Sequence, residues 1–380
     1  MSSITIIGSG LAGYTLAREF RKLDKQTPLR IITADQGDFY SKPMLSNALS
    51  KQQTPQQLVN TPAAQMAEKE NIEIINQCMV ESIDRDQQVL HTSQGEFSYS
   101  ELVLCNGANQ IKLNIDGDAT DEVMRVNSLQ DYEAFYQQLQ GKKHIVIMGA
   151  GLIGCEFAND LGNAGYQVSL VDLAPQPLGR LLPPQAAADL QAALSAQGIH
   201  WYLDNSVSAI NHSDDGYAIE LCDNTRLQAD LVLSAVGLRA DTGLAEAAGL
   251  ACQRGIVVNE FMQTSDAHIY ALGDCAEING QLLPYVMPIM IGARALAKTL
   301  HGEYTAVNYP AMPVMVKTPA CPVVVCPPPV QQHGEWLEEI VEGGVKSLFK
   351  QDDKLMGFAL TGSATAHKQQ LSRSLGQAAD

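Results

Sequence analysis

The pattern of apolar and polar positions near the start of the chain predicts a strand, a tight turn and a helix. Residues 4–7 form a short apolar run rich in β-branched side chains, which is typical of a buried parallel strand. The pattern over 14–23 predicts a helix, and a second apolar run follows at 29–33. This order predicts a βαβ unit. Three glycines at GxGxxG spacing stand in its first turn: Gly8, Gly10 and Gly13.

The same arrangement recurs in the middle of the chain. An apolar run at 144–148 precedes a helical pattern over 155–165, and another apolar run follows at 168–171. One glycine-rich turn is a weak signal, but two of them, each between a strand and a helix, predict two dinucleotide-binding units. The second turn repeats the glycine spacing of the first: Gly149, Gly151 and Gly154.

Each turn carries the residue types that a dinucleotide requires. The first glycine allows the tight turn, the second lets the backbone approach a pyrophosphate, and the third lets helix and strand pack closely. N–H groups at the start of the following helix would hold the phosphates. An acidic residue follows the second strand of each unit, Asp35 in the first and Asp172 in the second, where a ribose is bound in such folds. We therefore expect two cofactors, one flavin (FAD) and one nicotinamide (NAD(H)).

Later glycine turns decide the order of the two cofactors. Apolar strands within 101–110 and 230–242 each end in such a turn. The segment 264–278 contains a third apolar strand that ends on Gly273 and Asp274. A carboxylate at the carboxyl end of a strand lies where ligands of open α/β sheets bind. The segment looks like the second FAD fingerprint of flavoproteins with two dinucleotides, in which this aspartate binds the ribityl chain, so we place FAD in the first unit and NAD(H) in the second.

The predicted fold class is α/β. We expect two Rossmann-like βαβ dinucleotide-binding domains, in an order of motifs that resembles the glutathione reductase type, plus a small C-terminal α+β domain. The FAD-binding domain would be split between residues 1–110 and 240–305, with the NAD-binding domain inserted at 111–239. From residue 306 a strand–turn–strand pattern and polar turns predict the third domain, 306–380.

Composition and charge narrow the class of partner. The 380 residues carry a net charge of −17, with a pI near 4.8, which argues against nucleic acid or an anionic membrane surface. No apolar run approaches the ~18 residues of a membrane helix, and the N-terminus resembles no cleavable leader, so we expect a cytoplasmic protein without a membrane partner. The eight cysteines form no CxxC and no zinc-like spacing with histidine, so we expect mostly buried, reduced thiols and no metal site.

Five segments together resemble the FAD-dependent pyridine-nucleotide oxidoreductase superfamily, and within it the rubredoxin reductases. They are YSKPMLS (40–46), GLIGCEFANDL (151–161), SAVGLRADTGLA (234–245), IYALGDCAE (269–277) and VKTPACP (316–322). The resemblance covers nearly the whole chain. It implies an NADH-linked flavoprotein that passes electrons one at a time to rubredoxin, and it implies that these electrons feed an alkane hydroxylase. We expect it to act as a monomer.

The resemblance also implies which residues contact the cofactors. Lys42 and Glu156 would be catalytic. The helix predicted over 286–300 would point N–H groups, starting near Val286, at the pyrimidine edge of the flavin, and Lys317 matches a flavin-contacting lysine. The expected contacts are Gly8, Ser9, Gly10, Leu11, Ala12, Gly13, Thr33, Ala34, Asp35, Lys42, Val80, Gly149, Gly151, Gly154, Glu156, Asp172, Gly273, Asp274, Val286 and Lys317.

Lys42 and Glu156 are expected to form an ion pair, as a lysine and a glutamate do in the superfamily where the two cofactors meet. A buried, uncompensated lysine would cost several kcal/mol, which gives the pairing a physical reason. We expect the ammonium and the carboxylate within about 4 Å of each other.

The chain lacks the thiol pair that disulfide reductases of this superfamily carry. Disulfide reductases of this superfamily carry CxxxxC after the first βαβ unit, where this chain has SKPMLS (41–46). Cys321 and Cys326 have that spacing, but we interpret both as strand residues, and in an extended strand they would lie about 16 Å apart, too far for a bridge. Electrons are therefore expected to leave the flavin directly, toward a one-electron protein carrier.

Three other interpretations stay open. The same motifs suit a reductase of flavorubredoxin in nitric oxide detoxification, or an NADH-dependent reductase of small acceptors such as quinones. A non-enzymatic flavoprotein that senses the nicotinamide redox state is a further alternative.

Overall fold

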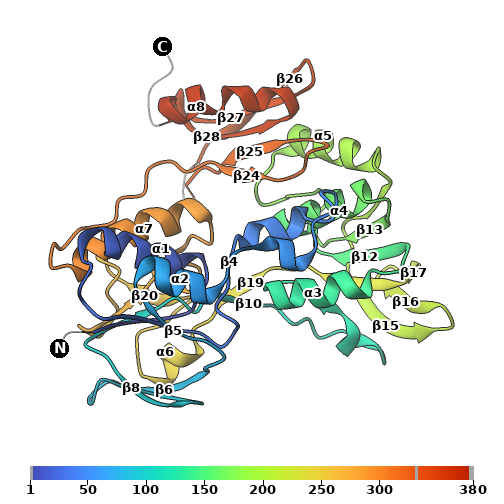
Figure 1. The fold of residues 1–380 in the computed structure, drawn as a ribbon. Coiled ribbons are helices and arrows are strands. Elements are labelled where there is room, and N and C mark those ends of the chain that lie inside the picture. The colour runs from blue at the N-terminus through green and yellow to red at the C-terminus, as the bar shows by residue number, and fades with distance from the viewer. Residues whose placement is uncertain (1–2, 330–332, 376–380) are drawn as a thin grey trace. The chain divides into compact units, whose positions relative to one another are not determined.

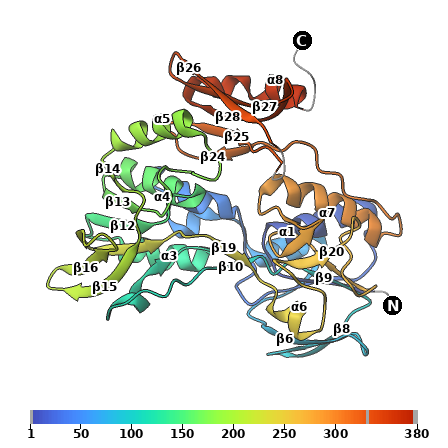
Figure 2. The ribbon, with the colours of Figure 1, turned by 180° about the vertical axis from the view of Figure 1, so that it is seen from behind.

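The chain forms two units, each assembled from three separate segments of sequence. The computed structural model describes residues 3–329 and 333–375. Unit 1 comprises Met1–Lys42, Gln56–Asn109 and Leu238–Pro310. Unit 2 comprises Pro43–Pro55, Gln110–Gly237 and Ala311–Asp380. Figures 1 and 2 show the ribbon from opposite sides.

A parallel five-stranded sheet is the centre of unit 1, and its strand order is β21-β9-β1-β2-β5. The first strand lies in the middle and is buried at all four positions, because parallel neighbours and packed layers cover it on every side. Helices α1 and α7 pack against each other over this sheet (Figure 1). The bounds are β1 Ile4–Ile7, β2 Leu29–Ile32, β5 Glu73–Ile75, β9 Glu101–Leu104, β21 Ile269–Ala271, α1 Leu11–Leu23, α2 Ala63–Glu70 and α7 Val286–Leu300.

Small antiparallel elements complete unit 1. One three-stranded antiparallel sheet has the order β6-β7-β8. In another, of order β20-β22-β23, strands β20 and β22 are parallel and strands β22 and β23 are antiparallel. Strands β3 and β4 form a two-stranded pair. The bounds are β3 Phe39–Tyr40, β4 Val59–Thr61, β6 Val80–Asp84, β7 Val89–Thr92, β8 Gly95–Ser98, α6 Gly243–Ala247, β20 Ile256–Val258, β22 Ala276–Ile278 and β23 Gln281–Leu282.

Unit 2 repeats the parallel sheet, in the order β11-β18-β12-β13-β14. Here β12 takes the central place that β1 has in unit 1, and each of these strands leads into a glycine-rich turn. An antiparallel sheet, β15-β16-β17, packs beside it. The bounds are β11 Met124–Arg125, α3 Leu129–Gln138, β12 His144–Met148, α4 Leu152–Asn163, β13 Gln167–Val171, α5 Pro184–Ser195, β14 Ile199–Tyr202, β15 Val207–Ser213, β16 Gly216–Leu221, β17 Arg226–Ala229 and β18 Leu231–Ser234.

The C-terminal part of unit 2 is an antiparallel sheet of order β24-β25-β28-β27-β26. Helix α5 packs against this sheet (Figure 2). The Glu338 carboxylate accepts from the backbone N–H groups of Gln185 and Ala186 at the start of α5, and Thr361 Oγ1 donates to Asp189 further along that helix. The bounds are β24 Val314–Val316, β25 Val323–Cys326, β26 Glu335–Val341, β27 Gly344–Gln351, β28 Lys354–Thr361 and α8 Lys368–Ser374.

The predicted α/β fold with two βαβ units and a small C-terminal sheet is confirmed. Three local expectations differ. Helices α1 and α4 begin at Leu11 and Leu152, each three residues before the predicted start, because the second glycine of each turn is already the N-cap. Cys321 lies outside a strand, since a turn places its N–H on the Thr318 carbonyl, whereas Cys326 ends β25 as predicted. The three-domain division at 110, 240 and 306 stays a prediction.

Candidate active site

The first glycine-rich turn leaves room for a phosphate beside its second glycine. Gly8 has a φ of +108°, and a Cβ there would overlap the Cys105 carbonyl oxygen. A Cβ on Gly13 would overlap the Gly8 carbonyl oxygen. By contrast, nothing lies within 4 Å of the Cβ position of Gly10. No side chain caps α1, which begins with Leu11 and Ala12, so its first N–H groups can receive an anion. This turn fits a dinucleotide pyrophosphate.

Asp35 is tied to the first turn by hydroxyl groups. Its Oδ1 accepts from Ser9 Oγ at 2.9 Å, from Thr33 Oγ1 at 2.8 Å and from the Gly37 N–H at 2.8 Å. The Ser9 and Thr33 hydroxyls also lie 3.0 Å apart. All of these bonds converge on Oδ1, so they orient the carboxylate at the carboxyl end of β2, where the sequence predicts a ribose contact. Ala34 lies between Thr33 and Asp35 in this turn, and Val80 begins β6.

Lys42 and Asp274 influence each other within unit 1. Burial raises the pKa of the Asp274 carboxyl, and the positive charge of Lys42 opposes that rise. Asp274 follows Gly273, whose φ is +92°. Val286 is the first residue of α7 and is 42% exposed, and no side chain caps that helix. A carboxylate, a lysine and an uncapped helix start are groups that can bind the polar parts of a flavin.

The second glycine-rich turn has the same backbone as the first. Gly149 has a φ of +104°, and a Cβ there would meet the Ala235 carbonyl oxygen at 2.6 Å. A Cβ on Gly154 would overlap the Gly149 carbonyl oxygen, whereas the space around Gly151 is open to 4 Å. Helix α4 starts without a side-chain cap. This turn therefore fits a second dinucleotide.

Asp172 holds the second turn in place. Its Oδ2 accepts from the Ala150 N–H at 2.5 Å, and its Oδ1 accepts from the Ala174 N–H at 2.7 Å. Both carboxylate oxygens thus have one donor each at the end of β13, and each retains a lone pair for a ribose hydroxyl.

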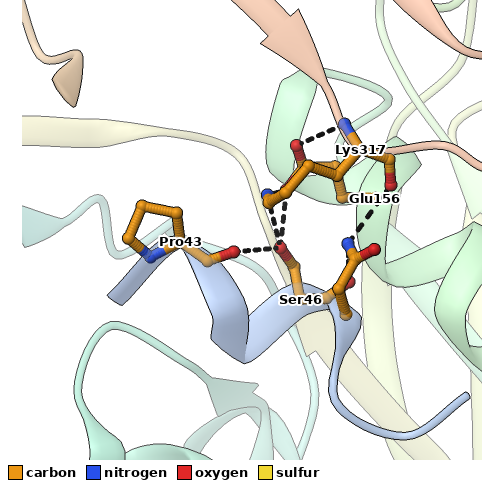
Figure 3. Close-up of polar contacts among 5 residues, drawn as sticks. Pro43, Ser46, Glu156 and Lys317 are labelled. Atoms are coloured by element: carbon orange, nitrogen blue, oxygen red, sulfur yellow. Dashed lines mark hydrogen bonds and ion pairs between the residues drawn. The ribbon is translucent and has the colours of Figure 1, made fainter. Parts of the chain in front are cut away.

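Glu156 and Lys317 form a buried ion pair in unit 2 (Figure 3). Glu156 is 1% exposed and lies in the second turn of α4, while Lys317 follows β24. The Lys317 N–H donates to Glu156 Oε1 at 2.9 Å, and the Lys317 ammonium donates to Oε2. The Lys317 side chain is 27% exposed, so the ammonium keeps an open side. Such a pair can place positive charge beside a bound ligand without leaving the glutamate uncompensated.

The structure joins Glu156 to Lys317, and the predicted pairing of Lys42 with Glu156 stays a prediction. Lys42 ends the first segment of unit 1, whereas Glu156 belongs to unit 2. Sequence reasoning assigned Lys317 to the flavin alone. Its second role depends on a contact across 161 residues, for which the local pattern carries no signal.

The segment Pro43–Pro55, which we call the strap, is held on α4 by carboxylates. Ser46 Oγ donates to Glu156 Oε2 at 2.5 Å. Four residues further along the helix, Asp160 accepts from the Leu49 N–H at 2.9 Å and from the N–H and hydroxyl of Ser50 at 2.9 and 2.5 Å. Residues four apart share one face of a helix, so a single face of α4 holds the strap at residues 46, 49 and 50.

Three strap and helix residues at this site were missed from the sequence. They are Ser46, Asn47, whose Nδ2 donates to the Lys317 carbonyl at 3.2 Å, and Asn159, whose Oδ1 accepts from the Ala320 N–H at 3.1 Å. The available signal was the SKPMLS segment, where hydroxyl residues stand in the place of the thiols of disulfide reductases.

All eight cysteines are free, and six of them are buried, as expected. Burial raises the pKa of Cys321 to about 12 and that of Cys326 to about 11, so neither is a ready thiolate. Within residues 3–329 and 333–375, no group of three or more His, Cys, Asp or Glu side chains could hold a metal ion. In the same described residues, no helix is long and apolar enough to span a membrane.

Comparisons with known proteins agree with this arrangement. Residues 2–297 match the family model described as pyridine nucleotide-disulphide oxidoreductase, and residues 306–375 match the model of a rubredoxin binding C-terminal domain.

Full-length relatives carry related names. The rubredoxin-NAD(+) reductase of Acinetobacter baylyi is 49% identical, over 98% of this chain and 96% of the relative. That of Alcanivorax borkumensis is 46% identical over 99% of each chain. The nitric oxide reductase FlRd-NAD(+) reductase of Vibrio vulnificus is 38% identical, also over 99% of each. Among solved structures, a ferredoxin reductase from Rhodopseudomonas palustris has a TM-score of 0.89 at 27% identity, covering 97% of this chain and 93% of its own.

Proposed function

The chain belongs to the pyridine nucleotide-disulphide oxidoreductase family, and we propose that it is a flavoprotein that takes electrons from NADH and delivers them, one at a time, to rubredoxin. FAD and NAD(H) are its cofactors. FAD, when bound, accepts two electrons together and releases them singly, which suits it to link a nicotinamide with a one-electron carrier.

The observation that carries this proposal is the match of the C-terminal sheet to a rubredoxin binding domain, in a chain that is 46–49% identical to rubredoxin-NAD(+) reductases over its full length. A second observation agrees with it. The SKPMLS segment places Ser46, and no thiol, against Glu156, so no disulfide relay stands between the cofactors and the acceptor.

Each unit would bind one dinucleotide. In unit 1 the first glycine-rich turn would hold the FAD pyrophosphate and Asp35 its ribose, while Asp274, Lys42 and the start of α7 would hold the flavin end. A positive group and N–H donors there stabilise the negative charge of a reduced ring. In unit 2 the second turn and Asp172 would hold NADH.

The Glu156–Lys317 pair would position charge at the nicotinamide end of the site. The ammonium, fixed by the carboxylate, offers positive charge on its open side, and the carboxylate cannot leave the pair without becoming an uncompensated buried anion. The open side of the ammonium would thereby face developing negative charge without a rearrangement.

Rapid-mixing measurements on the purified, FAD-loaded protein test the proposal. We expect fast reduction by NADH, fast reoxidation by oxidised rubredoxin and slow reoxidation by air. Flavorubredoxin and ferredoxin are mixed in parallel as competing acceptors. The variant Gly10→Ala, prepared in the same way, is the control without bound flavin. Rapid oxidation by air would favour a reductase of small acceptors, and a long-lived reduced state that no carrier discharges would favour a redox sensor.

A flavorubredoxin reductase is the second candidate. Relatives named nitric oxide reductase FlRd-NAD(+) reductase match 84% to 99% of this chain at 36–43% identity. Turnover with flavorubredoxin that exceeds turnover with rubredoxin would favour it. Action in the cytoplasm as a monomer, and a link to alkane hydroxylation, stay predictions.

A further inference from the structure

The Ser46 hydroxyl lies inside the polar cluster of Glu156 and Lys317. It donates to Glu156 Oε2 at 2.5 Å, it lies 3.3 Å from the Lys317 ammonium nitrogen, and it is 3.4 Å from the Pro43 carbonyl (Figure 3). Ser46 is 3% exposed, and it belongs to the 3₁₀ helix Lys42–Asn47. The hydroxyl is therefore enclosed, and its most direct partner is the carboxylate.

This hydroxyl gives Glu156 a donor that Lys317 does not supply. Among the described residues, the other two side-chain hydrogen bonds to the Glu156 carboxylate come from the N–H and the ammonium of Lys317 itself. Because both of those bonds come from one residue, they tie the carboxylate to no third element. The bond from Ser46 does so, because it joins Oε2 to the strap.

We propose that Ser46 is a positioning residue for electron transfer from NADH: it anchors the Glu156 carboxylate to the strap and so fixes where the Lys317 ammonium lies. Asn47 supports the same anchor, because its Nδ2 donates to the Lys317 carbonyl at 3.2 Å. The inference rests on the proposed function, since it concerns how the site receives electrons from NADH.

The chain offers a matched control. Ser50 lies on the same strap and donates its hydroxyl to a carboxylate of the same helix, Asp160, also at 2.5 Å. No lysine or arginine ion pair of Asp160 occurs among the described salt bridges. Ser46→Ala and Ser50→Ala therefore each remove one hydroxyl-to-carboxylate bond between the strap and α4, although Ser46 is buried and Ser50 is exposed, and only the first touches the charged pair.

The first experiment separates binding of NADH from the reduction step. We expect Ser46→Ala to lower the limiting rate of flavin reduction about tenfold while the concentration of NADH at half-saturation changes less than about twofold. Ser50→Ala should leave both values within about twofold of the wild type. Ser46→Thr, which keeps the hydroxyl, should restore most of the rate. Equal effects of the two alanine variants would overturn the proposal.

The second experiment needs no cofactor. Urea unfolding of the FAD-free protein is measured for Ser46→Ala, Glu156→Ala and the double variant. If Ser46 acts through Glu156, the shift in unfolding midpoint caused by Ser46→Ala should nearly vanish when Glu156 is already alanine. Additive shifts would overturn the proposal even if the Thr variant failed to fold.

Failure of the proposed function gives a different result. It would show as no flavin reduction by NADH in the wild-type protein. A wild type that reduces normally, together with an unchanged limiting rate in Ser46→Ala, refutes only the role of Ser46.

Discussion

Glu156 receives two hydrogen bonds from the single residue Lys317, one on each carboxylate oxygen, although the two residues are 161 positions apart. One donor is a backbone N–H and the other is the ammonium. The carboxylate therefore fixes the backbone of Lys317 as well as its charge. This places the start of the C-terminal sheet, through β24, directly against the helix that follows the second glycine-rich turn.

Removing the cation should destabilise the fold strongly. In Lys317→Met, the Glu156 carboxylate stays buried without its partner, and the free energy of unfolding should fall by about 3 kcal/mol, the lower part of the range for buried pairs because the lysine is partly exposed. The double variant Lys317→Met/Glu156→Gln should recover most of that loss, since no charge is left buried. Urea unfolding measures all of these values.

A surface pair is the control for that experiment. Lys346 lies 3.6 Å from Glu339, whose side chain is 66% exposed. Lys346→Met should therefore lower the free energy of unfolding by less than about 1 kcal/mol. Similar losses in the two lysine variants would show that the buried pair contributes no more than a surface pair.

The second glycine of each turn should be dispensable for folding and required for binding. Gly10 and Gly151 have φ values of −70° and −73°, which alanine adopts freely, and no atom would crowd the added methyl. The methyl would instead occupy the space of a phosphate. Gly10→Ala should therefore lose FAD, and Gly151→Ala should keep FAD while binding NADH weakly.

Fluorescence titration with FAD and equilibrium titration with NADH check these outcomes. Gly13→Ala is the contrasting variant, because its methyl would overlap the Gly8 carbonyl oxygen and should lower the yield of folded protein. Normal FAD binding by Gly10→Ala would show that the pyrophosphate does not lie at this turn.

The sequence predicted those elements whose signal is local. The strand Ile4–Ile7, the strand His144–Met148 and the helix Val286–Leu300 were predicted with the bounds that the structure has, because apolar runs and a helical start mark them. Contacts between distant segments had no such signal. The SKPMLS segment drew attention to Ser46 only through its missing thiols, and the fold alone brings this serine to Glu156, 110 residues away.

The family resemblance helped only at matching positions. It identified Lys317 and Glu156 as site residues separately, but their ion pair depends on how the C-terminal sheet packs on α4, which periodicity does not encode. Cys321 was assigned to a strand for a similar reason, since apolar neighbours concealed the turn in which it lies.

Asp274 should make the stability of the FAD-free protein depend on pH. Burial raises the pKa of this carboxyl above its ordinary value of 3.8, despite the opposing charge of Lys42. Between the ordinary and the raised value the folded state binds more protons than the unfolded state, so this group makes stability fall as the pH rises. Asp274→Asn removes the titrating group. As the pH falls, the unfolding free energy of the wild type should therefore rise relative to that of the variant.

Urea unfolding of the FAD-free protein from about pH 4 to about pH 7 measures this trend. A difference between wild type and Asp274→Asn that does not change with pH would mean that the carboxyl titrates at its ordinary value.

Asp172 should make the protein prefer NADH to NADPH. Its two oxygens are held by the Ala150 and Ala174 N–H groups at the end of β13, so the carboxylate is fixed where the adenosine ribose lies in such folds. A ribose 2′-hydroxyl can donate to it, whereas a 2′-phosphate would be repelled. No lysine or arginine occurs between Asp172 and Arg180 to bind that phosphate.

Flavin reduction at low nucleotide concentration should be at least about tenfold faster with NADH, and Asp172→Ala should reduce that preference. Because Asp172 also holds the turn at Ala150, the variant should lose affinity for both nucleotides, with the larger loss for NADH. Comparable wild-type rates with the two nucleotides would show that Asp172 fixes the turn and does not read the ribose.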